Sequence, residues 1–422
     1  MTGTDYDAID FFRGNELVED PYPYFDWLRE QCPVQQESQY GVYMVTGYAE
    51  ACSVYTDPDS FSSCNSVTGP FPGFPVPLEG DDVSEQIEAH RAELPFSDQI
   101  TTMDPPKHRD HRHLLMRQLT PKRLKENEEF IWRLADRQTE ELVARGRCEL
   151  VSEYANPFTL LVVADLLGVP EDEHDEFRAA LARRSHHAVG STRDSMRGNP
   201  LEWLYDRFSR YIEERRREPR DDVLTALATT TFPDGTLPEV IDVVRIAANV
   251  FAAGQETTVR LLGTALQIIA ERPDLQQLLR ERPELVGDFV EETLRIESPV
   301  KGDFRLARRR TTLGGVDIPA GATVMVLNGA ANRDPRHFAD PDELRVERGN
   351  AREQLAFGRG VHSCPGGTLA RLEGRASVER LLDRTTEIHI SEEHHGPAGA
   401  RRYQYVPTYI LRGLTALHLE LS

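Results

Sequence analysis

Cys364 is the residue of this sequence whose surroundings most directly suggest chemistry. It lies in the run Phe-Gly-Arg-Gly-Val-His-Ser-Cys-Pro-Gly-Gly at residues 357–367, immediately before a segment with helical character. The four glycines in this run allow the backbone to approach something flat and bulky. A thiolate at such a turn could be a nucleophile or a metal ligand. This stretch alone leaves both alternatives open.

A second candidate lies in the middle of a long apolar segment. The helical pattern between Pro238 and Pro273 is uninterrupted, and residues 252–258 at its centre read Ala-Ala-Gly-Gln-Glu-Thr-Thr. A helix of this length would run roughly 50 Å, and apolar residues on more than one side predict that it is central and buried. A glycine there costs about 1 kcal/mol relative to alanine, and a charged Glu256 beside Thr257 suits a buried helix poorly. Such departures from local rules tend to mark function.

Residues 107–123 form a basic stretch in an acidic protein. They contain six Lys or Arg residues against one acid, Asp110, which gives a local charge of +5. Because the whole chain carries −21, the remainder carries −26 (−21 − 5). We predict a basic helix here that faces an anionic target, either the carboxylate of an internal cofactor or an acidic partner.

The elements that must position these residues predict a mainly α-helical chain with a smaller β region. Helical patterns cover residues 149–218, with breaks near 168–170 and 190–200, and residues 284–296. Alternating patterns predict a hairpin over 34–46, strand and turn segments over 300–326, and strands over 403–410 and 414–421.

Residues 61–100 read as a long loop rich in proline and glycine, with a short amphipathic helix inside it. Loops of this length in compact domains are usually functional or disordered. The loop offers five apolar side chains that could contact a ligand or only fix the loop in place: Phe71, Phe74, Val76, Leu78 and Phe96.

Composition limits the classes of partner. A net charge of −21 argues against nucleic acid and acidic membrane surfaces as general partners. The five scattered cysteines fit a reducing cytoplasm better than a disulfide framework. Residues 1–19 lack the features of a signal peptide, and no window reaches the 18 or so apolar residues of a membrane span. We therefore expect a cytoplasmic protein without a membrane anchor.

Taken together, these residues resemble the cytochrome P450 family of haem monooxygenases. Residues 357–366 match its cysteine loop, Phe-Gly-x-Gly-x-His-x-Cys-x-Gly, at every fixed position. Other family motifs occur in order from about residue 20 to the end: His108-x-x-x-Arg112, Ala253-Gly-Gln-Glu-Thr257, Glu292-x-x-Arg295, Phe304-Arg305-Leu306-Ala307, Ala331-Asn-Arg-Asp-Pro335 and Leu369-Ala-Arg-x-Glu373. A single match would be weak, whereas the ordered set is very specific.

The resemblance is to the soluble bacterial type and implies the cytochrome P450 fold, with a long central helix over the haem. It implies one domain over residues 1–422, an α-rich bulk with a β-rich subdomain built from parts of 30–50, 300–326 and 403–421. Cys364, as a thiolate, would be the proximal axial ligand of the iron of haem b. Phe357 would pack on the proximal haem face, and the glycines around Cys364, Gly358 among them, would let backbone N–H groups reach the sulfur.

The competing interpretations of Cys364 fare less well beside this resemblance. Zinc requires four ligands at tight spacing, and only His362 lies near. A nucleophile needs a pattern of His with Asn or Asp, and none is evident.

The resemblance also assigns the groups around the haem. His108, Arg112, Arg305 and His362 would neutralise the two propionates, which must be paired if buried. On the distal side, Ala253 belongs to the oxygen-binding helix, and Gly254 and Thr257 would open that helix for dioxygen. Thr257 would hydrogen-bond the oxygen, and Glu256 would relay protons from solvent. Glu292 and Arg295 would join Arg348 in a buried structural ion cluster.

The implied activity is insertion of one oxygen atom of O2 into an apolar small molecule such as a terpenoid, steroid or aromatic compound. The sequence has no flavin or iron–sulfur segment, so we expect electrons from a ferredoxin-type donor with an NAD(P)H-dependent reductase, docking near Arg109, His113, Arg117 and Lys122. Two alternatives are a peroxide-driven, rearranging or coupling haem–thiolate enzyme, and a haem sensor or binding protein without turnover. The pair of Glu256 and Thr257 argues against a pure peroxygenase and would be superfluous in a sensor.

The substrate pocket is expected from the family layout. The lining would come from the loop 61–100, the break at 190–200, Ile246, Asn249, Ala253, Val300 and the turn at Tyr409 and Ile410. Asp303 and Lys301 could add a polar contact.

Overall fold

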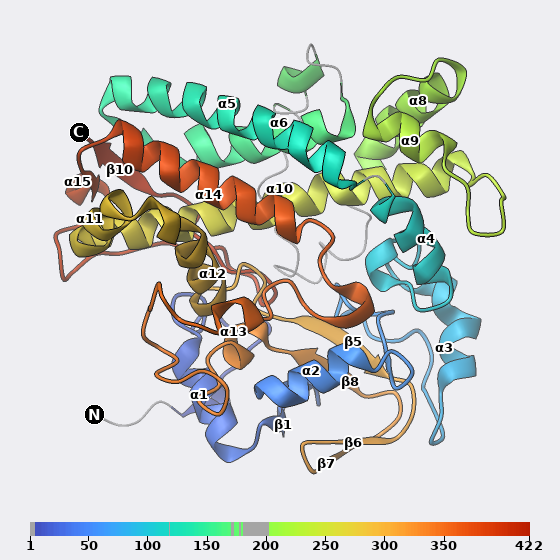
Figure 1. The fold of residues 1–422 in the computed structure, drawn as a ribbon. Coiled ribbons are helices and arrows are strands. Elements are labelled where there is room, and N and C mark those ends of the chain that lie inside the picture. The colour runs from blue at the N-terminus through green and yellow to red at the C-terminus, as the bar shows by residue number, and fades with distance from the viewer. Residues whose placement is uncertain (1–4, 118, 170–172, 177–178, 180–201) are drawn as a thin grey trace.

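The computed structural model describes residues 5–117, 119–169, 173–176, 179 and 202–422. Figure 1 shows a region of long helices and, beside it, a region with the largest sheet and the helices α1 and α2. The helices are α1 (Tyr22–Gln31), α2 (Tyr48–Thr56), α3 (Ser84–His90), α4 (Lys107–Met116), α5 (Pro121–Arg145), α6 (Asn156–Leu167), α8 (Glu202–Arg217), α9 (Val223–Thr229), α10 (Val240–Glu271), α11 (Pro273–Glu281), α12 (Val286–Ile296), α13 (Asn328–Ala331), α14 (Gly367–Arg384) and α15 (Glu392–His395). The prediction of a mainly α-helical chain with a smaller β portion is confirmed.

The described strands form three sheets. Their bounds are β1 (Val34–Gln36), β2 (Tyr43–Val45), β3 (Phe61–Ser62), β4 (Arg147–Glu149), β5 (Asp303–Ala307), β6 (Thr311–Leu313), β7 (Val316–Ile318), β8 (Thr323–Val326), β9 (Ile388–Ile390) and β10 (His418–Leu421). The largest sheet has the order β1-β2-β8-β5-β3, the second β4-β10-β9, and β6 pairs with β7. The predicted hairpin is β1 antiparallel to β2, with Val34 opposite Val45, and β2 then runs parallel to β8.

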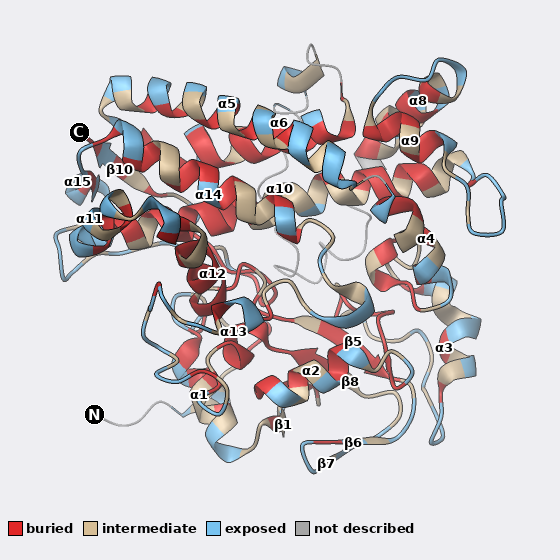
Figure 2. Ribbon diagram, viewed as in Figure 1, coloured by how far each residue is buried: buried red, intermediate tan, exposed pale blue. Residues whose placement is uncertain are grey.

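The helix α10 confirms the long central helix predicted between two prolines. It spans 32 residues, about 48 Å at 1.5 Å per residue, and ends just before Pro273. It contacts α6, α8 and α14, and Figure 2 shows buried residues where α5, α6, α10 and α14 face one another. Many residues of α10 are buried against these neighbours, whereas Gln255, Glu256 and Thr257 at its centre are only half-buried.

Two predictions of element boundaries are wrong. The basic stretch 107–123 is not one helix, since α4 ends at Met116 and α5 begins at Pro121. Residues 403–410 are not a strand: they form only an isolated bridge, Tyr405 opposite Leu414, because the segment turns back so that Val406 N–H donates to Gly413 O at 3.0 Å. The predicted strand over 414–421 is present as β10, but β10 pairs with β4 and β9, apart from the sheet that holds β2, β5 and β8.

The predicted breaks in the helical region have different outcomes. The break near 168–170 is confirmed where it is described, because α6 ends at Leu167 and Gly168 takes the left-handed conformation at φ 70°. The break at 190–200 lies outside the described residues.

Candidate active site

A cavity of about 320 Å³ brings together most of the residues singled out in the sequence. Its described lining includes nine of the ten predicted site residues: Cys364, His108, Arg112, Arg305, His362, Phe357, Gly358, Ala253 and Thr257. Glu256 is the tenth, and it is not among the lining residues. The cavity therefore lies between α10 on one side and the cysteine loop, residues 357–367, on the other.

The backbone of the cysteine loop requires glycine at two positions. Gly358 and Gly360 have φ values of +61° and +72°, which side chains disfavour. At Gly360 a Cβ atom would also lie 2.3 Å from the backbone oxygen of Tyr55, so α2 and this loop approach each other as closely as backbones can. The Cys364 N–H donates to Phe357 O at 2.8 Å and closes the loop. The thiol is thereby held at the cavity wall, three residues before α14.

The environment of the Cys364 sulfur contains opposing electrostatic effects. Cys364 is exposed at the cavity that it lines, but the surrounding protein still desolvates its sulfur, and this desolvation raises the pKa of the thiol. Hydrogen bonds from the backbone N–H groups of Gly366 and Gly367, together with the charges of Arg112 and Arg371, act in the opposite direction. The sequence predicted such N–H groups from the glycines around Cys364 without naming Gly366 or Gly367, and groups of this kind stabilise a thiolate.

Two histidines and two arginines gather on one wall of the cavity, and Asp303, which also lines it, pairs with Arg305 Nη1 at 3.3 Å. The rings of His108 and His362 are in contact, tilted by 36° with centroids 3.8 Å apart. Burial, Arg305 and His108 lower the pKa of His362 to about 2, and burial and Arg112 lower that of His108 to about 4. The buried His362 Nε2 has no hydrogen-bond partner. The cluster is therefore set up to receive an anionic group from the cavity.

This cluster and the thiol fit a haem group. Haem presents its iron to one protein sulfur and its two carboxylates to basic side chains, and both kinds of group line this cavity. An incoming carboxylate would pair with the charges of Arg112 and Arg305 and would offer a hydrogen-bond acceptor to His108 and His362. Arg112 also links the two halves of the site, since its Nη2 donates to Ser363 O in the cysteine loop at 2.6 Å.

On the α10 side the cavity is lined by small and hydroxyl-bearing residues. The Thr257 hydroxyl donates to Ala253 O at 2.9 Å, one turn earlier in the helix. A Cβ atom on Gly254 would lie 3.0 Å from Val163 Cγ2, so Gly254 allows α6 to approach α10 closely. The glycine at the centre of the helix therefore has a packing role in addition to lining the cavity.

The side chain of Glu256 does not line the cavity. Its Oε1 accepts from Arg260 Nη2 at 2.5 Å, one turn along α10. Arg260 is buried, and a Cβ atom on Gly413 would lie 2.6 Å from Arg260 Cγ, so the turn around Gly413 covers the arginine stem. The carboxylate of Glu256 is thus held by a buried guanidinium beside the cavity wall, an arrangement that the sequence did not predict.

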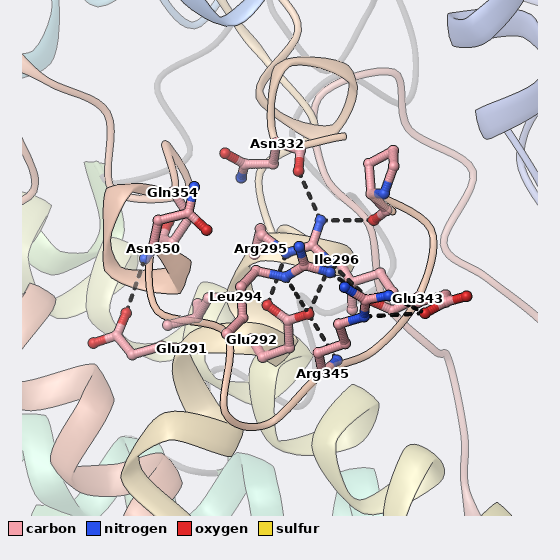
Figure 3. Close-up of polar contacts among 12 residues, drawn as sticks. Glu291, Glu292, Leu294, Arg295, Ile296, Asn332, Glu343, Arg345, Asn350 and Gln354 are labelled. Carbon is pink, nitrogen blue, oxygen red and sulfur yellow. Dashed lines mark hydrogen bonds and ion pairs between the residues drawn. The ribbon is translucent and has the colours of Figure 1, made fainter. Parts of the chain in front are cut away.

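The ion cluster predicted at Glu292, Arg295 and Arg348 is present, and Figure 3 shows Glu292 and Arg295 within it. Arg295 Nε and Nη2 donate to the two oxygens of Glu292 at 2.7 and 2.8 Å, and Arg348 Nε donates to Glu292 Oε1 at 2.9 Å. The side chains of Glu292 and Arg295 are fully buried. Arg295 also donates to the carbonyls of Asn332 and Pro341, so the cluster joins α12 to the chain between α13 and the cysteine loop.

Glu373 is a cavity residue whose position the sequence reasoning missed. It entered only as part of a motif, yet it is 1% exposed, lines the cavity, and its Oε2 has no hydrogen-bond partner. Burial alone raises its pKa well above the usual range. The signal in the sequence was an acid within an otherwise buried face of α14, near Leu369, Gly374 and Ala376.

The predicted substrate contacts are only partly correct. Asn249, Ala253, Val300 and Asp303 line the cavity, whereas Ile246, Lys301, Tyr409 and Ile410 are not among its described lining. Of residues 61–100, only Ile100 is a lining residue. The five apolar side chains proposed there for ligand contact do not reach the cavity: Phe71 and Phe96 pack against the core around Phe12 and Tyr409, and Phe74 and Leu78 pack against that around Val83 and Ile87.

Within the described residues, no helix is both long enough and apolar enough to cross a membrane.

Comparison with known proteins gives a consistent result along the chain. The family model described as Cytochrome P450 matches residues 204–386. Cytochrome P450 144 of Mycobacterium tuberculosis is 34% identical over 421 residues, which covers 99% of this chain and 92% of that protein. Vitamin D(3) 25-hydroxylase of Pseudonocardia autotrophica is 31% identical over 427 residues, covering 100% and 98% of the two chains.

A solved structure is similar over the same extent. Mycobacterium marinum cytochrome P450 CYP150A6 in its substrate-free form superposes with a TM-score of 0.93 at 58% identity, covering 99% of each chain.

Proposed function

Because the chain belongs to the cytochrome P450 family, we propose that it hydroxylates an apolar small molecule with electrons supplied by a ferredoxin. The chain is a monooxygenase that uses haem, with a thiolate bound to its iron, and O2. The proposal adds the roles of individual residues, the kind of substrate and the kind of electron donor.

The observation that carries the proposal is the pairing of one thiol with one basic cluster on the same cavity. We propose Cys364 as the sulfur that binds the iron and His108, Arg112, Arg305 and His362 as the partners of the carboxylates. When bound, the haem supplies the oxidising chemistry, in which one atom of O2 enters a substrate C–H bond and the other leaves as water. Two electrons and two protons complete this balance, and the protein must deliver both.

We assign proton delivery to α10. The Thr257 hydroxyl lies at the cavity and is hydrogen-bonded to Ala253 O, so it can accept or pass a proton without leaving its helix. Glu256 stands one residue earlier and faces Arg260. Its carboxylate is held by Arg260 outside the cavity lining, and we propose that it takes protons from the outer side of α10 and passes them to Thr257.

We propose a bulky and mostly apolar substrate. The cavity is lined by Val250, Ala253 and Gly254 of α10, by Val163 and Leu166 of the adjacent α6, and by Val300. Two relatives are named for such substrates, a vitamin D3 25-hydroxylase and a 6-deoxyerythronolide B hydroxylase. A further structural neighbour was solved in complex with testosterone.

The first test addresses the assignment of Cys364. The purified holoenzyme, reduced under carbon monoxide, is expected to show the red-shifted Soret band of a thiolate-bound iron, and Cys364→Ser is expected to lose that band. A wild-type protein without the shifted band contradicts the assignment.

The second test addresses turnover. With a ferredoxin, its reductase and a compound that shifts the ferric spectrum, Thr257→Ala is expected to consume NADPH while its yield of product per NADPH falls on the order of tenfold, with peroxide released instead. Thr258→Ala is the matched control, because this neighbouring hydroxyl residue is also at the cavity, and it is expected to keep the wild-type yield. Equal yields in both variants contradict the role of Thr257, and product formation from peroxide alone at the full rate favours the peroxide-driven alternative.

A further inference from the structure

We propose that the side-chain oxygen of Asn249 anchors a hydrogen-bond donor, a hydroxyl or an N–H group, at the end of the substrate away from the reacting carbon. This inference rests on the proposed function, since it concerns the substrate of the same cavity. It narrows the expected ligand from any apolar molecule to an extended one with a donor at one end.

The orientation of the Asn249 amide follows from a chain of polar contacts behind the cavity wall. Arg245, one turn earlier on α10, places its Nε 2.8 Å from Asp98 Oδ2. Gln99 Nε2 donates to Tyr205 Oη at 2.6 Å and to Asp98 Oδ1 at 3.3 Å. Both hydrogens of this amide are thereby used. The Gln99 oxygen must then be the atom that faces Asn249.

Asn249 completes this chain. Its Nδ2 donates to Gln99 Oε1 at 3.5 Å. Gln99 is only 2% exposed, so this contact cannot readily be exchanged for water. One N–H of the Asn249 amide is directed at Gln99, so the oxygen on the other branch of the amide is the acceptor that we assign to the cavity that Asn249 lines. The Asp98 carboxylate at the other end of this chain sets the direction of its hydrogen bonds, because a carboxylate can only accept.

The surroundings make this acceptor distinctive. The neighbouring described lining residues on α10 and α6 are Val250, Ala253, Gly254, Val163 and Leu166, none of which carries a polar side-chain atom. A hydrogen-bond donor of the substrate loses its water partner when it binds there. Burial of that donor without a new acceptor would be costly. Asn249 supplies that partner beside these five apolar residues, whereas the lining hydroxyls of α10, Thr257 and Thr258, lie two turns further along the helix.

The position along α10 sets an approximate length. Asn249, Ala253 and Thr257 follow at intervals of four residues and all line the cavity. At 1.5 Å per residue, Asn249 and Thr257 are about 12 Å apart along the helix axis. Since oxidation is assigned to the Thr257 end, the donor group of the substrate should stand on the order of 10 Å from the carbon that is oxidised.

Paired alcohols and ketones test the inference on the ferric holoenzyme. The probes are testosterone with androstenedione, and cyclododecanol with cyclododecanone, each titrated by the shift of the Soret band. The wild type is expected to bind each alcohol about three- to tenfold more tightly than its ketone, the range of one net hydrogen bond. Asn249→Leu is expected to bind the alcohols and ketones of each pair equally.

Two further variants separate the anchor from general effects on the pocket. Gln99→Leu frees the Asn249 amide to turn its nitrogen towards the cavity, so the preference for alcohols is expected to shrink or reverse. Val250→Ala, a change at a neighbouring apolar lining residue, is expected to weaken alcohols and ketones by the same factor and to leave the preference intact.

The inference and the proposed function fail in different ways. An unchanged alcohol preference in Asn249→Leu, a wild-type preference for ketones, or no binding by any of the four probes overturns the inference. None of these results affects the ferrous carbonyl spectrum. Loss of the thiolate-type band in the wild type, by contrast, overturns the assignment of Cys364 whatever the probes do.

Discussion

Two ionisable side chains, Glu373 and Lys301, are buried near the cavity, and within the described part of the chain neither has an opposite charge in direct contact. Glu373 has no side-chain hydrogen bond at Oε2. Lys301 donates from Nζ to Thr408 O at 2.6 Å and is 5% exposed. Burial disfavours the charged form of each group, so it raises the pKa of Glu373 and lowers the pKa of Lys301. Their effects on stability therefore change with pH in opposite directions.

Lys301 gives the clearer prediction because its pKa falls into an accessible range. Burial and the charges of Arg412 and Arg260 lower this pKa from 10.5 to about 7. Between pH 7 and 10.5 the unfolded chain therefore binds more protons than the folded one, and the stability of the wild type rises with pH. Lys301→Met removes this dependence. Its stability relative to the wild type is expected to fall by roughly 2 kcal/mol between pH 7 and 9.

Urea unfolding of the holoenzyme at several pH values measures this difference. The Thr408 carbonyl loses the same donor at every pH, so that cost shifts the curve without changing its slope. Lys125→Met, at an exposed position of α5, is the control and should differ from the wild type by a constant amount. A flat difference for Lys301→Met would show that the amine keeps its proton in the folded protein.

At the scale of elements, the fit of α6 against α10 depends on a missing side chain at Gly254. Both Gly254 and Gly263 lie inside α10, where alanine is favoured over glycine by about 1 kcal/mol. A Cβ atom would lie 3.0 Å from Val163 Cγ2 at Gly254 but 4.0 Å from the nearest atom, of Val151, at Gly263. Substitution by alanine at either glycine should therefore gain the same helix propensity. The two substitutions differ in the contact that the new Cβ atom would make.

Gly263→Ala is therefore expected to stabilise the protein by up to about 1 kcal/mol. Gly254→Ala is expected to be neutral or destabilising by about 1 kcal/mol, because Val163 must move. The double variant Gly254→Ala/Val163→Ala should recover part of that loss. Urea unfolding of the wild type, the two single variants and the double variant measures the coupling energy between the two positions. Equal stabilisation by both alanines would mean that the two helices separate at no cost.

How far the sequence predicted these elements depends on the range of the forces involved. The helix α10 was predictable because Pro238 and Pro273 delimit it and its apolar residues lie on several sides. The cysteine loop was predictable because its glycines and its thiol are adjacent in sequence. The predicted ligand contacts in residues 61–100 were wrong because these apolar side chains pack within two local cores. The periodicity of a sequence does not distinguish a side chain that packs against protein from one that contacts a ligand.

Long-range pairing set the remaining limits. The position of Arg260 against Gly413 and Glu256 joins segments more than 150 residues apart, which no local pattern encodes. The same holds for the polar chain from Arg245 through Asp98 and Gln99 to Asn249. In residues 403–410 apolar and polar side chains do alternate, as predicted for a strand. The backbone hydrogen bonds of this segment are nevertheless made by a turn and not by a partner strand.

At the scale of the whole molecule, the distribution of charge is relevant to the electron donor. The protein carries −21 overall, yet α4 exposes Arg109, and Arg117 follows it at the surface. This helix contacts the cysteine loop through Arg112 and Ser363. Exposed Met116 lies between the basic residues, at 43% exposure, as an apolar contact for a partner. An acidic ferredoxin would be repelled by most of the surface and attracted here, next to the proposed iron ligand.

Reversing this local charge should slow electron transfer without disturbing the substrate pocket. Arg109→Glu with Arg117→Glu is expected to reduce the rate of reduction by a ferredoxin on the order of tenfold at low salt, because two attractive contacts become repulsive. The difference should shrink as ionic strength rises and the Debye length falls below about 10 Å. Stopped-flow formation of the ferrous carbonyl form gives the rate, and Soret titration with testosterone shows whether substrate binding is unchanged.

The control carries the same change in net charge at other surfaces. Arg310 precedes β6 and Arg402 follows α15, elements that lie away from α4 in Figure 1, and both arginines are exposed. Arg310→Glu with Arg402→Glu should slow reduction only slightly, through the overall charge. If both double variants slow reduction equally, long-range repulsion explains the effect and the donor docks elsewhere. If only the α4 variant is slow and added salt abolishes the difference, the basic surface beside the cysteine loop is where the electrons enter.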